Sequence, residues 1–277
     1  MFQIVEKIKR NEMVTTLTFL APFIAKKVKP GQFVIVRIDE NGERIPLTVA
    51  DFDAQKGTVS VTVQAVGYTT KKLCALNVGD SISNLVGPLG MPTEFGDVKK
   101  AIIVGGGVGC AIAYPQAKAL YNMGAEVDII AGFRSKDIVI LEDEMSKVCQ
   151  NLYITTDDGT YGRKGFVTDV LKELLDSGDY DLVVAIGPIP MMKFVSLTTK
   201  QYGVKTIVSL NPIMIDGTGM CGGCRVTVGG KTCFACVDGP DFDGHLVDFD
   251  ELARRNTLYK SEEAHACKMF GGEKSGK

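Results

Sequence analysis

The chain has 277 residues, of which 45% are hydrophobic and 23% charged, and its formal net charge is −2. This length accommodates two ordinary domains with hydrophobic cores, and the composition is typical of a soluble globular protein rather than a disordered one. No basic stripe follows the sequence, so we expect no nucleic-acid partner. The longest apolar runs are strand-sized and too short to span a membrane, and residues 1–10 lack the apolar core of a signal peptide. We therefore expect a cytoplasmic protein, in which clustered thiols bind metal rather than form disulfides.

Residues 1–96 predict a small antiparallel β-barrel. The stretches 13–20, 32–38 and 58–66 alternate polar and apolar residues and are rich in β-branched side chains, which is typical of strands with one buried face. Turns containing glycine separate these strands at short intervals, as in a small barrel. We expect one short helix at 69–76.

Residues 97–210 predict a second domain of the α/β class. Buried strands alternate strictly with helices here, which favours a Rossmann-like parallel sheet with right-handed crossovers. We expect strands at 99–109, 126–132, 151–156, 181–187 and 205–210, and helices at 110–124, 141–149, 166–178 and 191–203. A cysteine-rich loop then covers 211–243, and 244–277 forms a C-terminal tail in which one charged helix spans 247–267.

The glycine turn "VGGGVG" at 104–109 lies between a strand and a helix, where backbone N–H groups can hold a pyrophosphate. Gly105, Gly107 and Cys110 occupy the G-x-G-x-x-G frame, so the third glycine is missing and the fit to the dinucleotide fingerprint is partial. A glycine turn without a ligand is the alternative interpretation of this segment.

Two more strand ends strengthen the nucleotide hypothesis. Segments 155–165 and 187–192 would lie at the same carboxyl edge of the sheet, where ligands of such sheets bind. Arg134, at the tip of the second strand, would pair with a 2′-phosphate or stack on adenine, so the residues leave NAD and NADP open. We interpret Asp157 and Asp158 as ribose or turn contacts, and we identify no catalytic acid, base or nucleophile in the chain.

The barrel region contains two segments that could bind an anion. "RIPLT" at 44–48 combines an arginine, a proline and a hydroxyl residue on one strand and its turn, and "GYTT" at 67–70 leads into the N-terminus of a helix. By themselves they favour the simpler interpretation, an exposed arginine and a capped helix.

These two segments, followed by "GPLG" at 87–90 and by the glycine turn, resemble the ferredoxin–NADP reductase superfamily. The resemblance extends over residues 1 to about 245. It implies that the barrel binds FAD and that the second domain binds NAD(H). The implied FAD contacts are Arg44, Pro46, Leu47, Thr48, Gly67, Tyr68, Thr69 and Thr70. The implied nucleotide contacts are Gly106, Gly107, Val108 and Gly109, and the sheet edge adds Arg134, Asp157, Asp158, Gly187 and Pro188 as candidates.

Half of the eight cysteines fall within 214–240, among many glycines: Cys221, Cys224, Cys233 and Cys236. Zinc could take all four as two C-x2-C pairs. The other interpretation is a [2Fe–2S] cluster, because Asp216 occupies the first position of the plant-type C-x4-C-x2-C pattern, with Cys233 or Cys236 as the last ligand. The glycines favour the cluster, since a loop that wraps a binuclear centre needs their conformational freedom.

This loop resembles that of flavin reductase subunits, namely the electron transfer subunit of dihydroorotate dehydrogenase, the small subunit of NADH-dependent reduced ferredoxin:NADP oxidoreductase, and sulfide dehydrogenase subunits. The first type carries cysteine at the position of Asp216. The others carry aspartate there and read "DGTGMCG" and "FACVDGP" much as this chain does. The resemblance implies the ligand set Asp216, Cys221, Cys224 and Cys236, with Cys233 outside it.

The function implied by the resemblance is electron transfer. Such a subunit exchanges hydride between NAD(H) and FAD and passes single electrons through the [2Fe–2S] cluster to a larger flavoprotein subunit. In flavin-based bifurcation, that partner carries [4Fe–4S] clusters, forms a heterodimer with the small subunit and involves NADPH and, indirectly, ferredoxin. The alternatives are the electron transfer subunit of dihydroorotate dehydrogenase or sulfide dehydrogenase, and a zinc-bearing nucleotide-binding protein without turnover.

The remaining cysteines have simpler interpretations. We expect Cys74 and Cys149 on apolar helix faces in the core and Cys110 at the glycine turn, where a small side chain fits. Cys267 we expect to be exposed near a partner surface.

Overall fold

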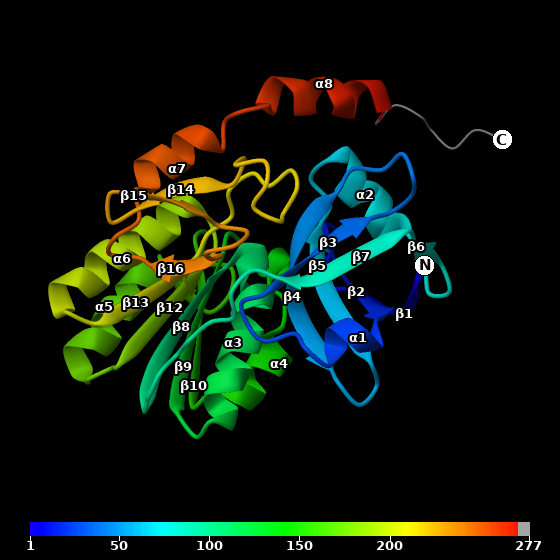
Figure 1. Ribbon diagram of the computed structural model, residues 1–277. Coiled ribbons are helices and arrows are strands. Elements are labelled where there is room, and N and C mark those ends of the chain that lie inside the picture. The colour runs from blue at the N-terminus through cyan, green and yellow to red at the C-terminus, as the bar shows by residue number, and fades with distance from the viewer. Residues whose placement is uncertain (271–277) are drawn as a thin grey trace.

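The computed structural model describes residues 1–270, apart from the side chains of Glu263, Ala266, Cys267 and Phe270. The expected exposure of Cys267 therefore lies outside the described residues. An N-terminal barrel packs beside a parallel sheet with helices on both faces, and the C-terminal segment runs from the sheet back toward the barrel (Figure 1).

The first sheet is antiparallel and curls into a nearly closed barrel. Its strands are β1 (Phe2–Lys9), β2 (Val14–Leu20), β3 (Phe33–Arg37), β4 (Ile45–Asp53), β5 (Thr58–Gln64), β6 (Ser81–Ile82) and β7 (Asn84–Leu89), with the helices α1 (Pro22–Ala25) and α2 (Tyr68–Ala75) between them. The spatial order is β6-β1-β2-β5-β4-β3-β7. Only Ser83 separates the two edge strands β6 and β7 in the chain, so the two edges of the sheet meet. The predicted barrel is confirmed.

The second sheet contains β8 (Lys100–Gly106), β9 (Glu126–Phe133), β10 (Asn151–Thr156), β11 (Arg163–Lys164), β12 (Leu182–Ile186), β13 (Lys205–Ser209) and β16 (Asp241–Asp243), in the order β11-β10-β9-β8-β12-β13-β16. Its main helices are α3 (Cys110–Asn122), α4 (Glu142–Met145), α5 (Val167–Ser177) and α6 (Ile189–Tyr202). Ile103 packs in the core under α3, and its neighbour Ile102 packs in the core under α5 and α6. Both faces of the parallel strands are therefore buried, as the uninterrupted apolar runs predict.

The C-terminal region differs from the prediction in two respects. The expected loop 211–243 contains a hairpin of β14 (Arg225–Val228) and β15 (Lys231–Phe234), and it ends in β16, which pairs antiparallel with β13. The expected single helix 247–267 is two helices, α7 (Phe249–Arg255) and α8 (Lys260–Phe270). A turn at 256–259 separates them, and its last residue, Tyr259, has a left-handed φ of 67° that redirects the chain before α8 begins.

A third difference lies at 141–149. The expected helix there is only α4, followed by a 3₁₀ turn at Ser146–Val148. Leu141, the residue before α4, has a φ of 62°, so α4 cannot begin earlier.

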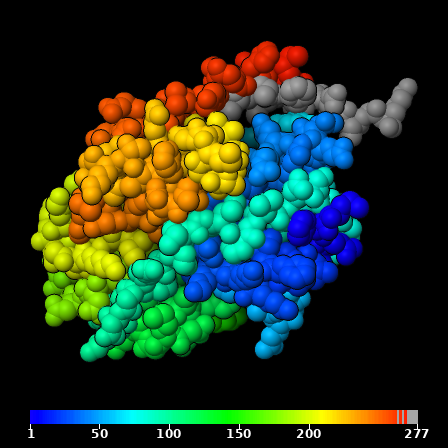
Figure 2. Space-filling view, viewed as in Figure 1, coloured from blue at the N-terminus to red at the C-terminus, as the bar shows by residue number. Residues whose placement is uncertain are grey.

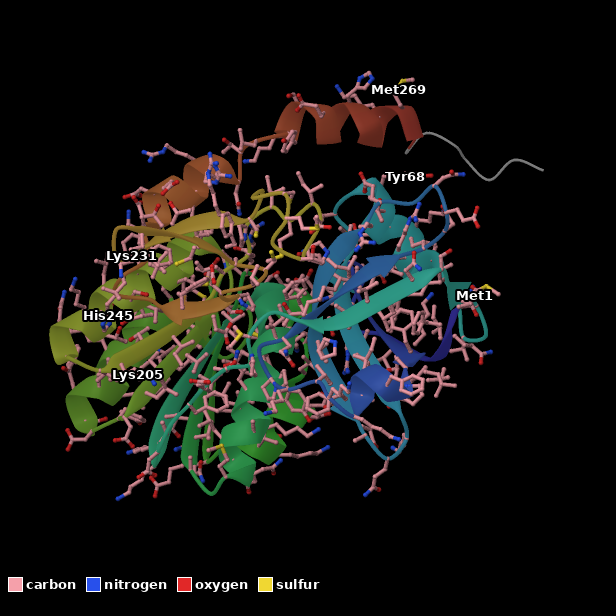
Figure 3. The ribbon with its side chains drawn as sticks, viewed as in Figure 1. Met1, Tyr68, Lys205, Lys231, His245 and Met269 are labelled. Atoms are coloured by element: carbon pink, nitrogen blue, oxygen red, sulfur yellow. The ribbon has the colours of Figure 1, made fainter. Side chains whose placement is uncertain are left out.

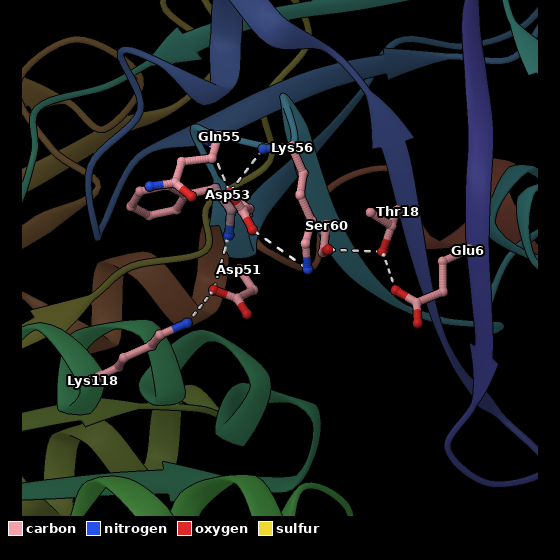
Figure 4. A network of polar contacts seen from close by, with 9 residues as sticks. Glu6, Thr18, Asp51, Asp53, Gln55, Lys56, Ser60 and Lys118 are labelled. Carbon is pink, nitrogen blue, oxygen red and sulfur yellow. Dashed lines mark hydrogen bonds and ion pairs between the residues drawn. The ribbon is translucent and has the colours of Figure 1, made fainter.

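Polar contacts join the barrel to the second sheet. Lys118 on α3 donates to Asp51 on β4 at 2.9 Å, and Figure 4 shows this pair beside the turn that Asp53 stabilises. Arg10, beyond the end of β1, pairs with Glu144 on α4. These contacts fix the barrel against the same helices that cover one face of the parallel sheet. Within residues 1–270, no helix has both the length and the apolar character needed to cross a membrane.

Candidate functional site

The glycine turn lies at the point where the strand order of the second sheet reverses, between β8 and β12. Ligands of doubly wound sheets bind in this crevice, at the carboxyl ends of the strands. Gly107–Gly109 form a single 3₁₀ turn that continues into α3. The turn touches the end of β12 so closely that a Cβ added to Gly109 would lie 2.4 Å from the carbonyl oxygen of Ile186. The backbone N–H groups at the start of α3 are thus presented in a fixed position.

Cys110 replaces the third glycine of the fingerprint and packs inward. Its side chain is fully buried in the core of the second sheet, and a Cβ added to Gly105 would lie 2.8 Å from its sulfur. Burial raises the pKa of the Cys110 thiol to about 12, so this thiol is inert at neutral pH. The glycine at 105 provides the room for that sulfur, which fits the expected location of Cys110. Cys74 and Cys149 are half-buried and pack against the barrel core and the second core, respectively. Cys74 lies on α2 as expected, but Cys149 does not lie on a helix, because it follows the 3₁₀ turn in an extended conformation.

The ends of β9 and β10 bring the other nucleotide candidates together. The N–H of Asp157 donates to the carbonyl of Phe133 at 3.1 Å, and that of Asp158 donates to the carbonyl of Arg134 at 3.2 Å. The carboxylate of Asp158 accepts bonds from Thr160, which lower its pKa. Asp158 therefore acts as a turn residue, whereas the exposed Arg134 is available to a ligand beside it. Gly187 and Pro188 follow β12 at the same edge of the sheet.

In the barrel, the segment 44–48 leaves one edge of its backbone without a strand partner. Ile45–Thr48 pair with β3, but the pairing of β4 with β5 begins only at Val49. Pro46 is tolerated here because the N–H that proline lacks is not required by a second strand. Arg44 precedes this open edge and is exposed. The open edge offers backbone donors and acceptors to a ligand that lies along the strand.

The N-terminus of α2 is capped by its own side chains. Thr70 Oγ1 accepts from the N–H of Gly67 at 2.9 Å, and Thr69 donates to the carboxylate of Glu43. Tyr68 begins the helix and points from the barrel toward the side on which α8 lies (Figure 3). The two threonines thus order the turn, and the first N–H groups of α2 remain a favourable position for an anion.

The cysteine segment contains two buried thiols in contact. Cys224 and Cys236 are 2% and 3% exposed, and their sulfurs lie 3.2 Å apart without a disulfide. They pack against Phe33 and Ile35 on the barrel strand β3. Burial, followed by the neighbouring Cys224, raises the pKa of Cys236 to about 12. Two sulfurs in contact can bind one metal ion together as thiolates.

Asp216 and Cys221 lie near one another on the exposed turn. The N–H groups of Gly223 and Asp216 point at the Cys221 sulfur, the first of them at 3.4 Å from it, and lower its pKa. The carboxylate of Asp216 accepts from both the N–H and the hydroxyl of Thr218, which lower its pKa, and the charge of Arg44 contributes in the same direction. Both groups are therefore biased toward the ionised forms that bind metals.

Cys233 lies apart from these residues. It is opposite Val226 in the β14–β15 hairpin and packs into the core of the second sheet, not with Cys224 and Cys236. Within residues 1–270, no three side chains of Cys, His, Asp or Glu converge as ligands of a single metal ion. Cys224 and Cys236 are in contact, and Cys221 lies close enough for its charge to raise the pKa of Cys236.

The cysteine segment lies on the surface directly against the barrel (Figure 2). Gly217 has a φ of 83°, and a Cβ at this position would lie 2.8 Å from Cδ1 of Ile35. Ile35 pairs across the sheet with Pro46. The cysteine segment thus packs against β3, the strand that pairs with the segment 44–48, a proximity that the linear sequence conceals.

One contact of this region is absent from the sequence-based prediction. The carboxylate of Asp241 on β16 is buried and accepts bonds from Thr93, which follows the barrel, and from Gln116 on α3 at 3.0 Å. Burial raises the pKa of this carboxyl. Asp241 therefore joins the barrel, α3 and the end of the cysteine segment, and only the three-dimensional packing of β16 reveals it.

Comparison with known proteins identifies relatives over nearly the whole chain. Residues 211–248 match the family model of the iron–sulfur cluster binding domain of dihydroorotate dehydrogenase B. A protein of Thermotoga maritima, named as a homologue of the electron transfer subunit of dihydroorotate dehydrogenase B (NAD(+)), is 46% identical, with 97% of this chain and 95% of the relative covered. The electron transfer subunit of that enzyme from Shouchella clausii is 35% identical, with 77% and 84% covered.

The fold is also similar to solved structures. The structure of NADH-dependent reduced ferredoxin-NADP oxidoreductase, described for flavin-based electron bifurcation, has a TM-score of 0.92 at 46% identity, with 98% of both chains covered. Phthalate dioxygenase reductase has a TM-score of 0.62 at 17% identity, with 82% of this chain and 85% of the reductase covered. The second match concerns the fold alone.

Proposed function

Because the chain belongs to the family of electron transfer subunits of dihydroorotate dehydrogenase B and their homologues, we propose that it transfers electrons between NAD(H) and a larger partner subunit. In this proposal the barrel holds FAD and the cysteine segment holds a [2Fe–2S] cluster. The 46% identity to a chain of NADH-dependent reduced ferredoxin-NADP oxidoreductase favours the small subunit of a bifurcating enzyme of that kind.

The observation that carries the proposal is the buried contact between Cys224 and Cys236 beside the barrel strand β3, with Cys221 and Asp216 on the neighbouring turn. Asp216 and Cys221 would bind one iron, and the buried pair Cys224 and Cys236 would bind the other. Cys233 would remain unliganded, because its side chain packs in a different core. A cluster bound by one oxygen and three sulfurs would supply one-electron transfer at a potential set by its ligands and surroundings.

The barrel offers a matching site for a flavin. The open backbone edge at Ile45–Thr48 would hydrogen-bond the ring, Arg44 would pair with a phosphate, and the start of α2 would receive the pyrophosphate. Bound FAD would supply the exchange of a hydride for single electrons. Because Ile35 contacts the cysteine segment on one side and pairs with Pro46 on the other, the two sites would be neighbours.

The nucleotide would bind at the crevice between β8 and β12. The glycine turn 106–109 would hold its pyrophosphate, and Arg134 would contact the adenosine half. Asp157 would be the ribose contact, since the carboxylate of Asp158 is already bonded to Thr160. Gly187 and Pro188 would line the crevice opposite the turn. The chain supplies position and orientation here rather than an acid or a base.

The larger subunit would cover the exposed apolar side chains around Cys221. Met220 is 88% exposed, and Ile215 and Val237 beside it are 54% and 44% exposed. A partner that carries a further flavin and [4Fe–4S] clusters would accept electrons there. Met220→Asp should abolish co-purification of the partner. Met123→Asp, which changes an exposed methionine at the C-terminal end of α3, should retain it.

The second candidate function is electron transfer to a dihydroorotate dehydrogenase subunit, which the family model that matches 211–248 favours. Co-purification distinguishes the two, because an orotate-producing flavoprotein would accompany the chain in that case. Asp216 favours the bifurcating enzyme, since the dihydroorotate dehydrogenase subunits resemble this chain but carry cysteine there.

The test of the proposal is reconstitution of the single chain with FAD, iron and sulfide. Addition of NADH should bleach the flavin absorption and produce one rhombic electron paramagnetic resonance (EPR) signal. Bound zinc without iron or flavin would instead favour a nucleotide-binding protein without turnover.

A further inference from the structure

The C-terminal end of α7 contacts the cysteine segment through two neighbouring side chains. Nη2 of Arg255 donates to the carbonyl oxygen of Gly223 at 3.1 Å, and Nδ2 of Asn256 donates to the carbonyl oxygen of Asn211 at 3.0 Å. Asn211 lies just after β13, where the segment begins, and Gly223 lies in its exposed turn. Helix α7 therefore restrains both the origin and the turn of the segment.

Gly223 is bonded on both sides. Its N–H donates to the sulfur of Cys221 at 3.4 Å, and its carbonyl accepts from Arg255. When both backbone groups of a glycine are bonded, rotation of either one breaks a bond, so the free φ and ψ of the residue are restricted. The bond from Arg255 thus stabilises the orientation in which the N–H points at the sulfur.

Helix α7 is itself well anchored. Asp248 caps its N-terminus by accepting from the N–H of Glu251 at 2.8 Å, and the N–H of Asp248 donates to Thr227 on β14 at 2.9 Å. Phe249 and Leu252 are 6% and 1% exposed and pack into the core of the second sheet. The guanidinium of Arg255 is therefore presented from a fixed helix rather than from a mobile loop.

The charge of Arg255 is not neutralised by an ion pair among the described residues. The side chain is half-buried, so its charge is screened less than that of an exposed arginine. A group bound by three thiolates and a carboxylate gains negative charge when it is reduced. A nearby fixed cation stabilises that more negative state.

We propose that Arg255 is a positioning residue for the iron–sulfur cluster. It fixes Gly223 so that the N–H faces the Cys221 sulfur, and its charge raises the reduction potential of the cluster. This inference rests on the proposed function. The effects of Arg255 on the backbone and on the reduction potential are measured separately. Failure of the positioning role is therefore distinguishable from failure of the proposed function.

The test compares the wild-type chain with three variants. Arg255→Gln removes the charge and the planar donor group, Arg255→Lys keeps the charge, and Arg254→Gln removes the same charge from the exposed neighbouring residue. Iron content, an EPR-monitored redox titration and amide hydrogen exchange of the segment 214–224 are measured for each. The exchange measurement requires no bound cluster.

For Arg255→Gln we expect exchange in 214–224 to rise about tenfold, which corresponds to an opening free energy lowered by about 1.4 kcal/mol. The reduced-to-oxidised ratio at fixed potential should fall about tenfold, or about 59 mV for one electron. Arg255→Lys should keep most of the potential but not the protection, and Arg254→Gln should match the wild type.

Wild-type exchange and potential in Arg255→Gln would overturn the inference, as would equal shifts in Arg254→Gln. If Arg255→Gln does not fold, wild-type protection in Arg255→Lys overturns the positioning role. A wild-type chain that binds no iron would refute the proposed function, and the exchange rates would still decide whether Arg255 orders the turn.

Discussion

The glycine turn at 104–109 and the cysteine segment at 211–243 are both rich in glycine, but glycine serves different purposes in them. In the turn, Gly109 permits backbone contact with Ile186. In the cysteine segment, Gly217 permits a left-handed backbone conformation and contact with Ile35. The first glycine allows two backbone segments to pack closely, whereas the second allows the chain to bend in a left-handed conformation against the barrel.

This difference predicts different dependence on a ligand. The turn is fixed by β8, β12 and α3, so its N–H groups are arranged before any nucleotide binds. In the cysteine segment, burial anchors Cys224 and Cys236, but Cys221 is exposed on its turn. A bound cluster would complete the order of the cysteine segment, whereas the backbone of the glycine turn is ordered without a ligand.

The largest effect should come from removal of a buried thiol. Cys236→Ser should lose most of the bound iron, because a hydroxyl is a poor replacement for a thiolate ligand. Cys233→Ser is the matched control and should keep its iron, since that side chain packs in another core. Iron analysis and EPR measure both variants, and the reverse result would show that Cys233 is the ligand.

Removal of the cluster should affect the two glycine-rich segments differently. After chelation, amide exchange in 214–224 should rise by roughly tenfold or more, because the metal contributes its binding free energy to the order of this segment. Exchange in 100–112 should stay unchanged. Equal changes in the two segments would contradict the distinction between them.

Substitution in the preformed turn should reduce both stability and nucleotide binding. Gly109→Ala places a Cβ 2.4 Å from a backbone carbonyl oxygen, and such overpacking costs about 1–3 kcal/mol. Gly124→Ala is the control, because its Cβ meets open space and only its φ of 88° is unfavourable. Denaturant unfolding and NADH titration compare the two variants. Unchanged NADH affinity in Gly109→Ala would remove the turn from the binding site.

The buried thiol of Cys110 should make stability depend on alkaline pH. Its pKa is raised from 9.0 to about 12, so the native state keeps a proton that the unfolded state loses. Stability from this group is complete below pH 9.0 and falls by about 1.4 kcal/mol per pH unit above it, up to the folded pKa. Unfolding of Cys110→Ala between pH 8 and 11 should lack this component. Identical pH profiles of the two proteins would place the thiol in contact with solvent.

The smallest effect should come from the contact between the barrel and α3. Lys118→Met removes the ion pair with Asp51 (Figure 4), and partly exposed pairs contribute about 0.2–1 kcal/mol. The loss should shrink at high salt. A loss of several kcal/mol, measured by denaturant unfolding, would mean that this contact controls how the barrel joins the sheet.

Local sequence patterns predict much of this fold, because the spacing of apolar residues within each strand shows which of its faces are buried. Leu17 and Phe19 alternate with polar residues and form the barrel core, and the uninterrupted run Ile102–Val104 predicts a strand buried on both faces. The β14–β15 hairpin was also detectable, since Gly229 and Gly230 separate two short alternating stretches. The strand β16 was not, because three residues that pair with β13 carry no period of their own.

For the candidate site, spacing identifies the donors but not their grouping. Cys233 and Cys236 both fit as the last ligand on spacing, and only their packing into different cores distinguishes them. The contact from Arg255 to Gly223 spans 32 residues and depends on how α7 packs. The turn at 256–259, which separates α7 from α8, contains no glycine or proline to predict it.

The most direct measurement of the central claim is the iron, sulfide and flavin content of the wild-type chain, purified without oxygen. We expect a coloured protein with two irons, two sulfides and one FAD per chain. NADH should reduce the flavin, and the cluster should then give one EPR signal. A colourless protein, or one that contains zinc in place of iron, would contradict it.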